Sequence, residues 1–143
     1  MFIKQISIFV ENKPGRLSAV TKLLGENGID IRALSVADTK DFGILRLIVN
    51  NPDKACEVLK NDSCTVSITN VIAIGITDKP GGLASAMECL YAANISVEYM
   101  YAFISQSDSQ AAVILRVDNN DKAAEALKDN GFKMLTSQEV YEI

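Results

Sequence analysis

The sequence predicts an α+β protein made of two tandem plaits, each with the element order βαββαβ and two helices on one face of a four-stranded antiparallel sheet. Two observations predict this fold. The 143-residue chain repeats itself at a nearly fixed spacing, and within each copy the apolar residues change between strand-like and helix-like periodicity. A copy of roughly 70 residues would be only marginally stable alone, which favours two adjacent units.

The repeat consists of four pairs of segments that occur in the same order in both copies. Residues 13–18, 28–31, 44–47 and 53–55 recur as residues 79–84, 94–97, 114–117 and 121–123. The offset stays between 66 and 70 residues, and its drift falls in predicted loops. Because the copies meet near Asn70, we expect one domain at residues 1–70 and a second at residues 71–143.

Each element of the first copy follows from a local pattern. Alternating apolar residues predict half-buried strands, apolar residues at helical spacing predict helices, and Pro, Gly and Asn mark the turns. The predicted elements are strands at 2–10, 30–37, 44–49 and 65–68, turns at 13–15 and 38–41, a helix from about Leu17 to Asn27, and a second helix that opens at 51–53. This order is that of the ferredoxin-like, split-βαβ plait.

The junction between the copies does not resemble a linker. From Val66 to Ile76 the even-numbered positions are apolar, with Asn70 the exception, and the odd-numbered positions are mostly small or polar. We therefore expect the last strand of the first copy to pass almost directly into the first strand of the second. Side-by-side and face-to-face packing of the two sheets both fit this pattern.

Composition excludes several classes of function. The chain has no histidine, so it cannot build a Ser-His-Asp triad, a Cys₂His₂ zinc site or an imidazole general base. Its net charge is −4 and its 14 basic residues are scattered, which argues against nucleic acid as a partner. We expect no catalytic residues, no metal and no cofactor.

The cysteines and the hydropathy of the chain bear on its compartment. Cys56, Cys64 and Cys89 are odd in number and form no CxxC pair, as is typical of a reduced, cytoplasmic protein. No segment reaches the roughly 18 uninterrupted apolar residues that predict a membrane span. We therefore expect a cytoplasmic protein with no membrane partner.

The strongest local signal is a Pro-Gly turn between a strand and a helix, present once in each copy as Pro14-Gly15 and Pro80-Gly81. Glycine allows a tight path just before a helix, leaving free N–H groups at the positive end of the helix dipole. A carboxylate fits there. Asn12 can donate and accept hydrogen bonds, and Asp30, at the start of the next strand, can receive an ammonium group. Together these groups predict a site for an α-amino acid, although Pro-Gly is also simply a good turn.

These residues resemble a known family. The pattern Asn12-x-Pro14-Gly15-x-Leu17, followed by residues 28–31 in a βαββαβ order, is similar to the ACT domain, a small-molecule regulatory module. The second copy resembles it through residues 78–83 and 94–97, so the resemblance covers nearly the whole chain. It implies a stand-alone tandem ACT protein that binds an amino acid or related metabolite at interfaces between ACT units and acts allosterically.

The resemblance also implies the site residues. Serine-binding members carry Asn at the position of Asn12 and Asn where this chain has Asp30, while the second copy has Asp78 and Ser96 at these positions. The two copies are therefore not equivalent sites. The candidate ligand-binding residues are Asn12, Lys13, Pro14, Gly15, Arg16, Leu17, Asp30 and Ile31 in the first copy and Asp78, Pro80, Gly81, Gly82, Leu83 and Ser96 in the second.

Two other classes of function compete with this interpretation. The chain could be an interaction module that docks on a metabolic enzyme without binding a metabolite, and an assembly of two identical chains also stays open. An enzyme that uses Asp30 or Glu98 has less support, because the matched positions carry Ser96 and Arg32 and do not form a repeated pair of acids.

Matched arginines stand in the third strand of each copy. Arg46 and Arg116 interrupt strands that are otherwise apolar. Either the arginine lies on the less covered face of the sheet, or it pairs with Asp30 or Glu98 on the neighbouring strand or with a ligand carboxylate.

Overall fold

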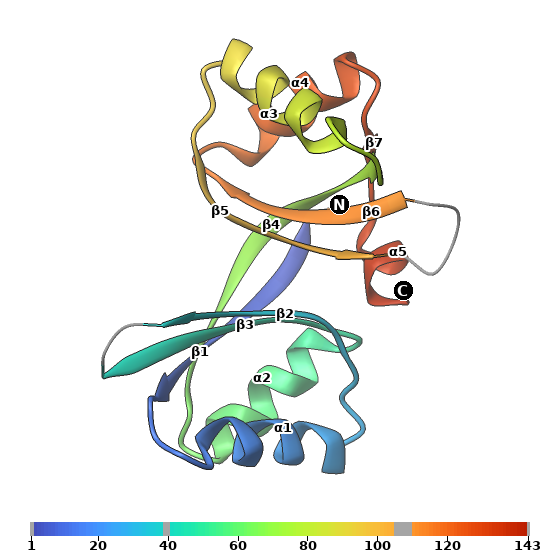
Figure 1. Ribbon diagram of the computed structural model, residues 1–143. Coiled ribbons are helices and arrows are strands. Elements are labelled where there is room, and N and C mark those ends of the chain that lie inside the picture. The colour runs from blue at the N-terminus through green and yellow to red at the C-terminus, as the bar shows by residue number, and fades with distance from the viewer. Residues whose placement is uncertain (1, 39–40, 105–109, 143) are drawn as a thin grey trace. The chain divides into compact units, whose positions relative to one another are not determined.

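The computed structural model describes residues 2–38, 41–104 and 110–142, which form two compact units of the predicted α+β class (Figure 1). The first unit is Lys4–Thr69, and the second is Asn70–Tyr141 together with Phe2 and Ile3. Each unit has the order βαββαβ, which confirms the predicted ferredoxin-like plait. Residues 39 and 40 of the predicted turn at 38–41 lie outside the described residues.

The first unit contains nearly all of its first strand, two further strands, two helices and the beginning of a fourth strand. The elements are β1 (Ile3–Glu11), α1 (Arg16–Glu26), β2 (Ile31–Asp38), β3 (Phe42–Val49), α2 (Pro52–Asn61) and the first part of β4 (Thr65–Thr77). The strand order is β2-β3-β1-β4, and β3 is antiparallel to both β1 and β2. Both helices cover one face of this sheet in Figure 1.

The alternating pattern of the first strand becomes one wall of the core. Ile6, Ile8 and Val10 of β1 are buried in one cluster with Leu45 and Leu47 of β3, and Leu24 of α1 is the buried side chain of its helix. Because successive strand residues point to opposite faces, this alternation places one apolar row under the helices.

The second unit repeats this arrangement and adds a short helix. After the remainder of β4 come α3 (Gly82–Ala92), β5 (Val97–Ile104), β6 (Gln110–Val117), α4 (Asn120–Asp129), β7 (Lys133–Met134) and α5 (Ser137–Tyr141). The strand order is β7-β4-β6-β5, with antiparallel pairing throughout, and α3 and α4 lie on one face of the sheet (Figure 1).

Strand β4 is a single 13-residue strand that belongs to both units. It confirms that the last strand of the first copy continues into the first strand of the second. Its burial follows the change of unit, because the side chains up to Asn70 are exposed or half-buried and those from Val71 to Ile74 are buried.

Helix α5 was not predicted, although the sequence carries its signal. Thr136 Oγ1 accepts a hydrogen bond from the Glu139 N–H (3.2 Å), and Glu139 Oε2 accepts one from the Thr136 N–H (2.8 Å). This reciprocal pair is a capping box, which a Thr followed three residues later by Glu predicts. The buried side chain of Val140 holds the helix against the protein.

Candidate functional site

The two Pro-Gly loops have almost the same backbone geometry. Gly15 has φ 87° and ψ −11°, and Gly81 has φ 86° and ψ −8°, which is the left-handed region that only glycine occupies without strain. Each glycine directly precedes a helix. No side chain from the described residues caps either helix. The Arg16 N–H donates to the Lys13 carbonyl oxygen (3.3 Å) and the Gly82 N–H to the Lys79 carbonyl oxygen (3.0 Å), so it is the N–H groups after these that can meet solvent or a ligand.

A small groove lies beside the first loop. Its volume is about 170 Å³, and it is lined by Val10, Glu11, Asn12, Leu17, Val36, Gly43 and Leu45. The Asn12 N–H donates to the Asp41 carbonyl oxygen (3.1 Å), which ties the loop to the start of β3. The predicted residues Lys13, Pro14, Gly15 and Arg16 are exposed at its rim. The structure therefore brings Asn12 and Leu17 into one groove.

Charge at the rim of the first groove is partly neutralised. Lys13 Nζ lies 3.0 Å from Glu11 Oε2. The hydrogen bond and the charge of Lys13, followed by the charge of Arg16, lower the pKa of the Glu11 carboxyl. Glu11 is therefore ionised at neutral pH, and an incoming carboxylate meets an acid as well as two cations.

The groove beside the second loop is larger and more cationic. Its volume is about 610 Å³, and it is lined by Gly75, Ile76, Thr77, Lys79, Pro80, Gly81, Gly82, Ser85, Gln110, Gly131, Phe132 and Lys133. Lys133 pairs with Glu139 (3.2 Å), whereas Lys79 has no ion-pair partner among the residues that the structure describes. Among the described residues no acidic side chain lines this groove, which favours an anionic ligand.

Some residues of the second groove could not be identified from the sequence. Lys79 belongs to the Pro-Gly motif but was not assigned a role, and Gln110 and Lys133 come from distant strands. Of the predicted residues, Leu83 packs against the hydrophobic core instead of lining the groove, and Asp78 is exposed outside it. Gln110 and Lys133 reach this groove only because β6 and β7 pair with β4, and no short sequence motif indicates that they would lie there.

Asp30 lies at the other end of the first sheet from Asn12. The Asp30 N–H donates to Asn50 Oδ1 (2.9 Å), and the Asn50 N–H donates to the Asp30 carbonyl oxygen (3.1 Å). Strands β1 and β2 flank β3 and are both antiparallel to it, so they run in the same direction. Asn12, which follows β1, therefore lies at the edge of the sheet where β2 ends, and Asp30 lies at the edge where β2 begins. Eight strand residues at about 3.3 Å each separate the two positions by about 26 Å.

This separation decides how Asn12 and Asp30 could act. Within one unit they cannot hold the same amino acid, and the Asp30 carboxylate pairs with Arg32. Ile31 packs against the core of its unit. Ser96, the counterpart of Asp30, is exposed, and its carbonyl oxygen accepts from the Asp118 N–H (3.3 Å). The start of the second strand is thus a position separate from the loop in both units.

The two matched arginines have different surroundings. Arg116 Nε donates to Glu98 Oε2 (3.1 Å), so of the alternatives left open by the sequence the pairing across β5 and β6 is the one found. The corresponding pair of Arg46 with Asp30 was wrong, because the register places Arg46 opposite Ser35. This pair does not form because Asp30 precedes β2 and lies beside Asn50, after the end of β3, whereas Arg46 is in the middle of β3.

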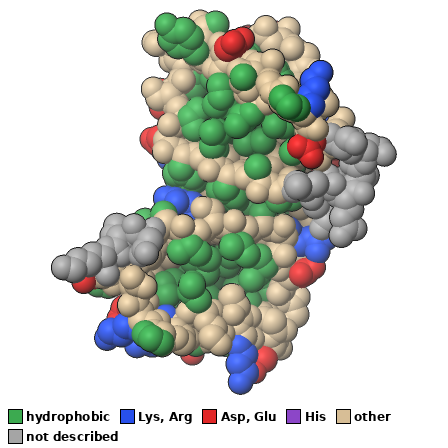
Figure 2. Space-filling model, viewed as in Figure 1, with side chains coloured by type: hydrophobic (Ala, Val, Ile, Leu, Met, Phe, Trp, Pro, Cys, Tyr) green, Lys and Arg blue, Asp and Glu red, His purple; other side chains and the backbone are tan. Residues whose placement is uncertain are grey.

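An apolar strip remains exposed along the edge of the first sheet. Leu34 and Val36 of β2 are 58% and 48% exposed, and Leu17 of α1 is 44% exposed. In the register, Leu34 lies opposite Leu47 and Val36 opposite Leu45, so both side chains point to the face of the sheet on which the helices pack. They stay exposed because the helices do not extend over the edge strand β2. Figure 2 shows hydrophobic side chains gathered at the surface of this unit.

Neither a metal site nor a membrane-crossing helix is found in the described part of the chain. Residues 2–38, 41–104 and 110–142 contain no group of three or more Cys, Asp or Glu side chains that could hold a metal ion. Within the same residues no helix is long and apolar enough to cross a membrane. The three cysteines are free.

Comparison with known families agrees with the duplicated fold and its loops. The model of the family described as "ACT domain pair" matches residues 1–143. The chain therefore belongs to the ACT domain pair family, a class of regulatory proteins, as the resemblance of the Pro-Gly motifs implied. A search of the curated proteins found no match.

Solved structures share the fold along almost the whole chain. The crystal structure of protein BT0572 from Bacteroides thetaiotaomicron is 42% identical, with 100% of this chain and 98% of that chain covered and a TM-score of 0.95. The ligand-free regulatory subunit of aspartate kinase from Thermus thermophilus is 15% identical, with 91% and 94% covered and a TM-score of 0.66. The same subunit from Thermus flavus is 15% identical, with 90% and 92% covered and a TM-score of 0.63.

Proposed function

We propose that this ACT domain pair is a regulatory sensor that binds an amino acid or a related small metabolite and carries no catalytic activity. The observation that supports it is the uncapped helix start after Gly15 and after Gly81, each beside a groove. Partly buried contacts between a carboxylate and a helix N-terminus contribute up to about 2 kcal/mol. Further polar contacts must supply the rest of the affinity.

The second groove is the better site for the ligand carboxylate. Within the part of the chain that the structure describes, Lys79 has no ion-pair partner and no acid lines the groove. We expect Lys79→Gln to weaken binding of an amino acid at this groove by about tenfold, the loss of one charge-assisted contact. Lys22→Gln, on the exposed face of α1, is the control. Equal affinity of the two variants would exclude the second groove.

The first groove requires a second copy of the chain if Asp30 contributes. Antiparallel pairing of β2 with β2 of another copy would bring the partner's Asp30 to the end of β2 that lies beside Asn12. The exposed side chains of Leu34 and Val36 support this pairing, because association would bury them. One ligand would then contact Asn12 of one chain and Asp30 of the other.

A thermal-shift screen of the twenty amino acids tests the proposal. A ligand at 100 times its dissociation constant should stabilise the protein by about 2.7 kcal/mol. Asn12→Ala and Asp30→Asn should each remove the part of the response that comes from the first groove, whereas Asn61→Ala, an exposed asparagine at the end of α2, should keep it. No response from any amino acid would contradict ligand binding.

A mixing experiment separates a shared site from two independent ones. When Asn12→Ala and Asp30→Asn chains are mixed, a mixed dimer has one site with both native residues, so binding should partly return. If neither variant binds at the first groove and their mixture does not bind there either, the site is not shared between copies.

Docking on a metabolic enzyme without a ligand is the second candidate function. The exposed strip of Leu17, Leu34 and Val36 supports it, since an edge strand with apolar side chains can pair with another protein. This function predicts a stable complex with an enzyme that is indifferent to amino acids and is lost in Leu34→Lys. For either function, the three free cysteines fit a reducing compartment such as the cytoplasm.

A further inference from the structure

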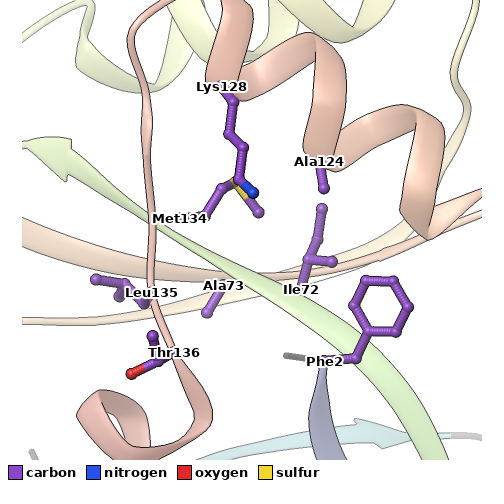
Figure 3. Close-up of a pocket in the computed structure, with 8 residues that line it drawn as sticks. All are labelled: Phe2, Ile72, Ala73, Ala124, Lys128, Met134, Leu135 and Thr136. Carbon is purple, nitrogen blue, oxygen red and sulfur yellow. The ribbon is translucent and has the colours of Figure 1, made fainter.

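A separate apolar pocket lies in the second unit, beneath α4 (Figure 3). Its volume is about 140 Å³. Ile72 of β4 and Ala124 of α4 point toward one another across it, and the Phe2 ring stands beside Ile72. Met134 closes the pocket at the end of β7. None of the residues of the two Pro-Gly grooves takes part in its wall.

One cation stands at this pocket. Lys128, in the last turn of α4, extends from the helix toward Met134 in Figure 3. No carboxylate of the described residues forms an ion pair with it. Thr136 is the other polar lining residue, and its hydroxyl accepts from the Glu139 N–H. An otherwise apolar wall therefore carries one positive charge and one hydroxyl group.

The repeat-related position in the first unit has a different character. There the pocket is lined by Asp53, Cys56, Glu57, Lys60, Asn61 and Ile68. Cys56 and Lys60 match Ala124 and Lys128 at the offset of 68 residues. Because the carboxylates of Asp53 and Glu57 line this pocket together with Lys60, an anion is disfavoured there. Unlike Lys60, Lys128 has a mainly apolar pocket beside it.

We propose that the pocket beneath α4 binds a short aliphatic monocarboxylate, with its hydrocarbon end against Ile72 and Ala124 and its carboxylate on Lys128. An apolar cavity of about 150 Å³ accepts a molecule as large as benzene, so a tail of about five or six carbons fits. The ammonium group supplies a charge-assisted hydrogen bond to the carboxylate. This site is additional to the Pro-Gly grooves and does not depend on them.

The probe for this site is 4-methylpentanoate, titrated into the whole chain while methyl resonances are followed by NMR. The methyl groups of Ile72, Ala124 and Leu135 should shift and saturate, whereas resonances of the Pro-Gly loops should not. Lys128→Gln should weaken binding of the carboxylate by about tenfold. It should leave binding of the uncharged 4-methylpentanol unchanged.

Two variants complete the test. Lys60→Gln, at the matched position of the first unit, should bind the carboxylate like the wild type. Ala124→Leu, which fills the pocket, should bind neither probe. If Ala124→Leu fails to fold, the comparison of Lys128→Gln with Lys60→Gln decides alone. Shifts that never saturate, shifts confined to the Pro-Gly loops, or equal affinities of the two lysine variants would overturn the proposal.

Discussion

Replacing Gly82 with alanine tests how closely the backbone approaches itself at the start of α3. A Cβ atom on Gly82 would lie 2.2 Å from the Thr77 carbonyl oxygen, and real Cβ contacts essentially never fall under 3.0 Å. Because the obstructing atom belongs to the backbone, no side-chain rotation relieves the overlap. The loop itself must move, and the groove that it lines must change shape.

The expected cost follows from that overlap. Forcing an extra methyl group into a packed position costs typically 1–3 kcal/mol of unfolding free energy. A loss of about 2 kcal/mol corresponds to a fall in Tm of roughly 4–8 °C for a chain of this size. We expect ligand binding at the second groove to weaken as well, while the first groove keeps its affinity.

Urea unfolding followed by circular dichroism measures the effect, with the midpoint compared at constant slope. Gly25→Ala is the matched control, because Gly25 lies in α1 with nothing within 4 Å of an added Cβ. It should gain up to about 1 kcal/mol from helix propensity. Gly15→Ala, which has space but a φ of 87°, should lose about 1–2 kcal/mol through backbone strain.

The matched position in the first copy shows that a residue with a side chain can stand at this point of the loop. The position of Gly82 is held in the first copy by Arg16, which carries a long side chain. If Gly82→Ala unfolds at the same urea concentration as the wild type, the Pro-Gly loop before α3 can adopt the backbone path of the loop before α1 without loss of unfolding free energy. The close approach to Thr77 would then not constrain the protein.

Two further predictions concern the ends of helices. The pKa of the Glu139 carboxyl is lowered from its ordinary 4.5, mainly by the hydrogen bond from the Thr136 N–H and to a smaller extent by the hydrogen bond from Lys133. The stabilisation is therefore present above about pH 4.5 and lost as the pH falls through the folded value. Glu139→Gln should thus be less stable than the wild type near pH 7, and the difference should shrink near pH 3, in urea unfolding; a constant difference would contradict this. Asn51 and Asn119 accept hydrogen bonds in the first turns of α2 and α4, so replacing either with alanine should cost about 1 kcal/mol; unchanged midpoints would show that neither cap matters.

The fold could be predicted because its signals are local and occur twice. Alternation in β1 indicates the buried face directly, and the matched Pro-Gly motifs mark the start of α1 and of α3. Helix α5 was missed although its capping box is visible in the sequence. A helix of five residues has too little periodicity to be recognised without that signal.

The candidate site was less predictable, because it depends on which strands are neighbours. Asn12 and Asp30 are 18 positions apart in the sequence, yet the parallel direction of β1 and β2 puts them at opposite ends of one sheet. The exposure of Leu34 and Val36 is equally hidden, since their apolar type predicts burial and only the edge position of β2 leaves them at the surface.

The two copies differ at grooves and pockets more than in their buried cores. Buried strand positions keep their apolar character, as in the cores around Leu47 and Leu115. Positions at grooves and pockets differ in charge or size between the copies: Arg16 matches Gly82, and Cys56 matches Ala124. A duplicated domain that bound one ligand twice would need the same polar groups twice. We therefore expect the two units to bind different ligands, and a variant in one groove should leave the other unit's affinity unchanged.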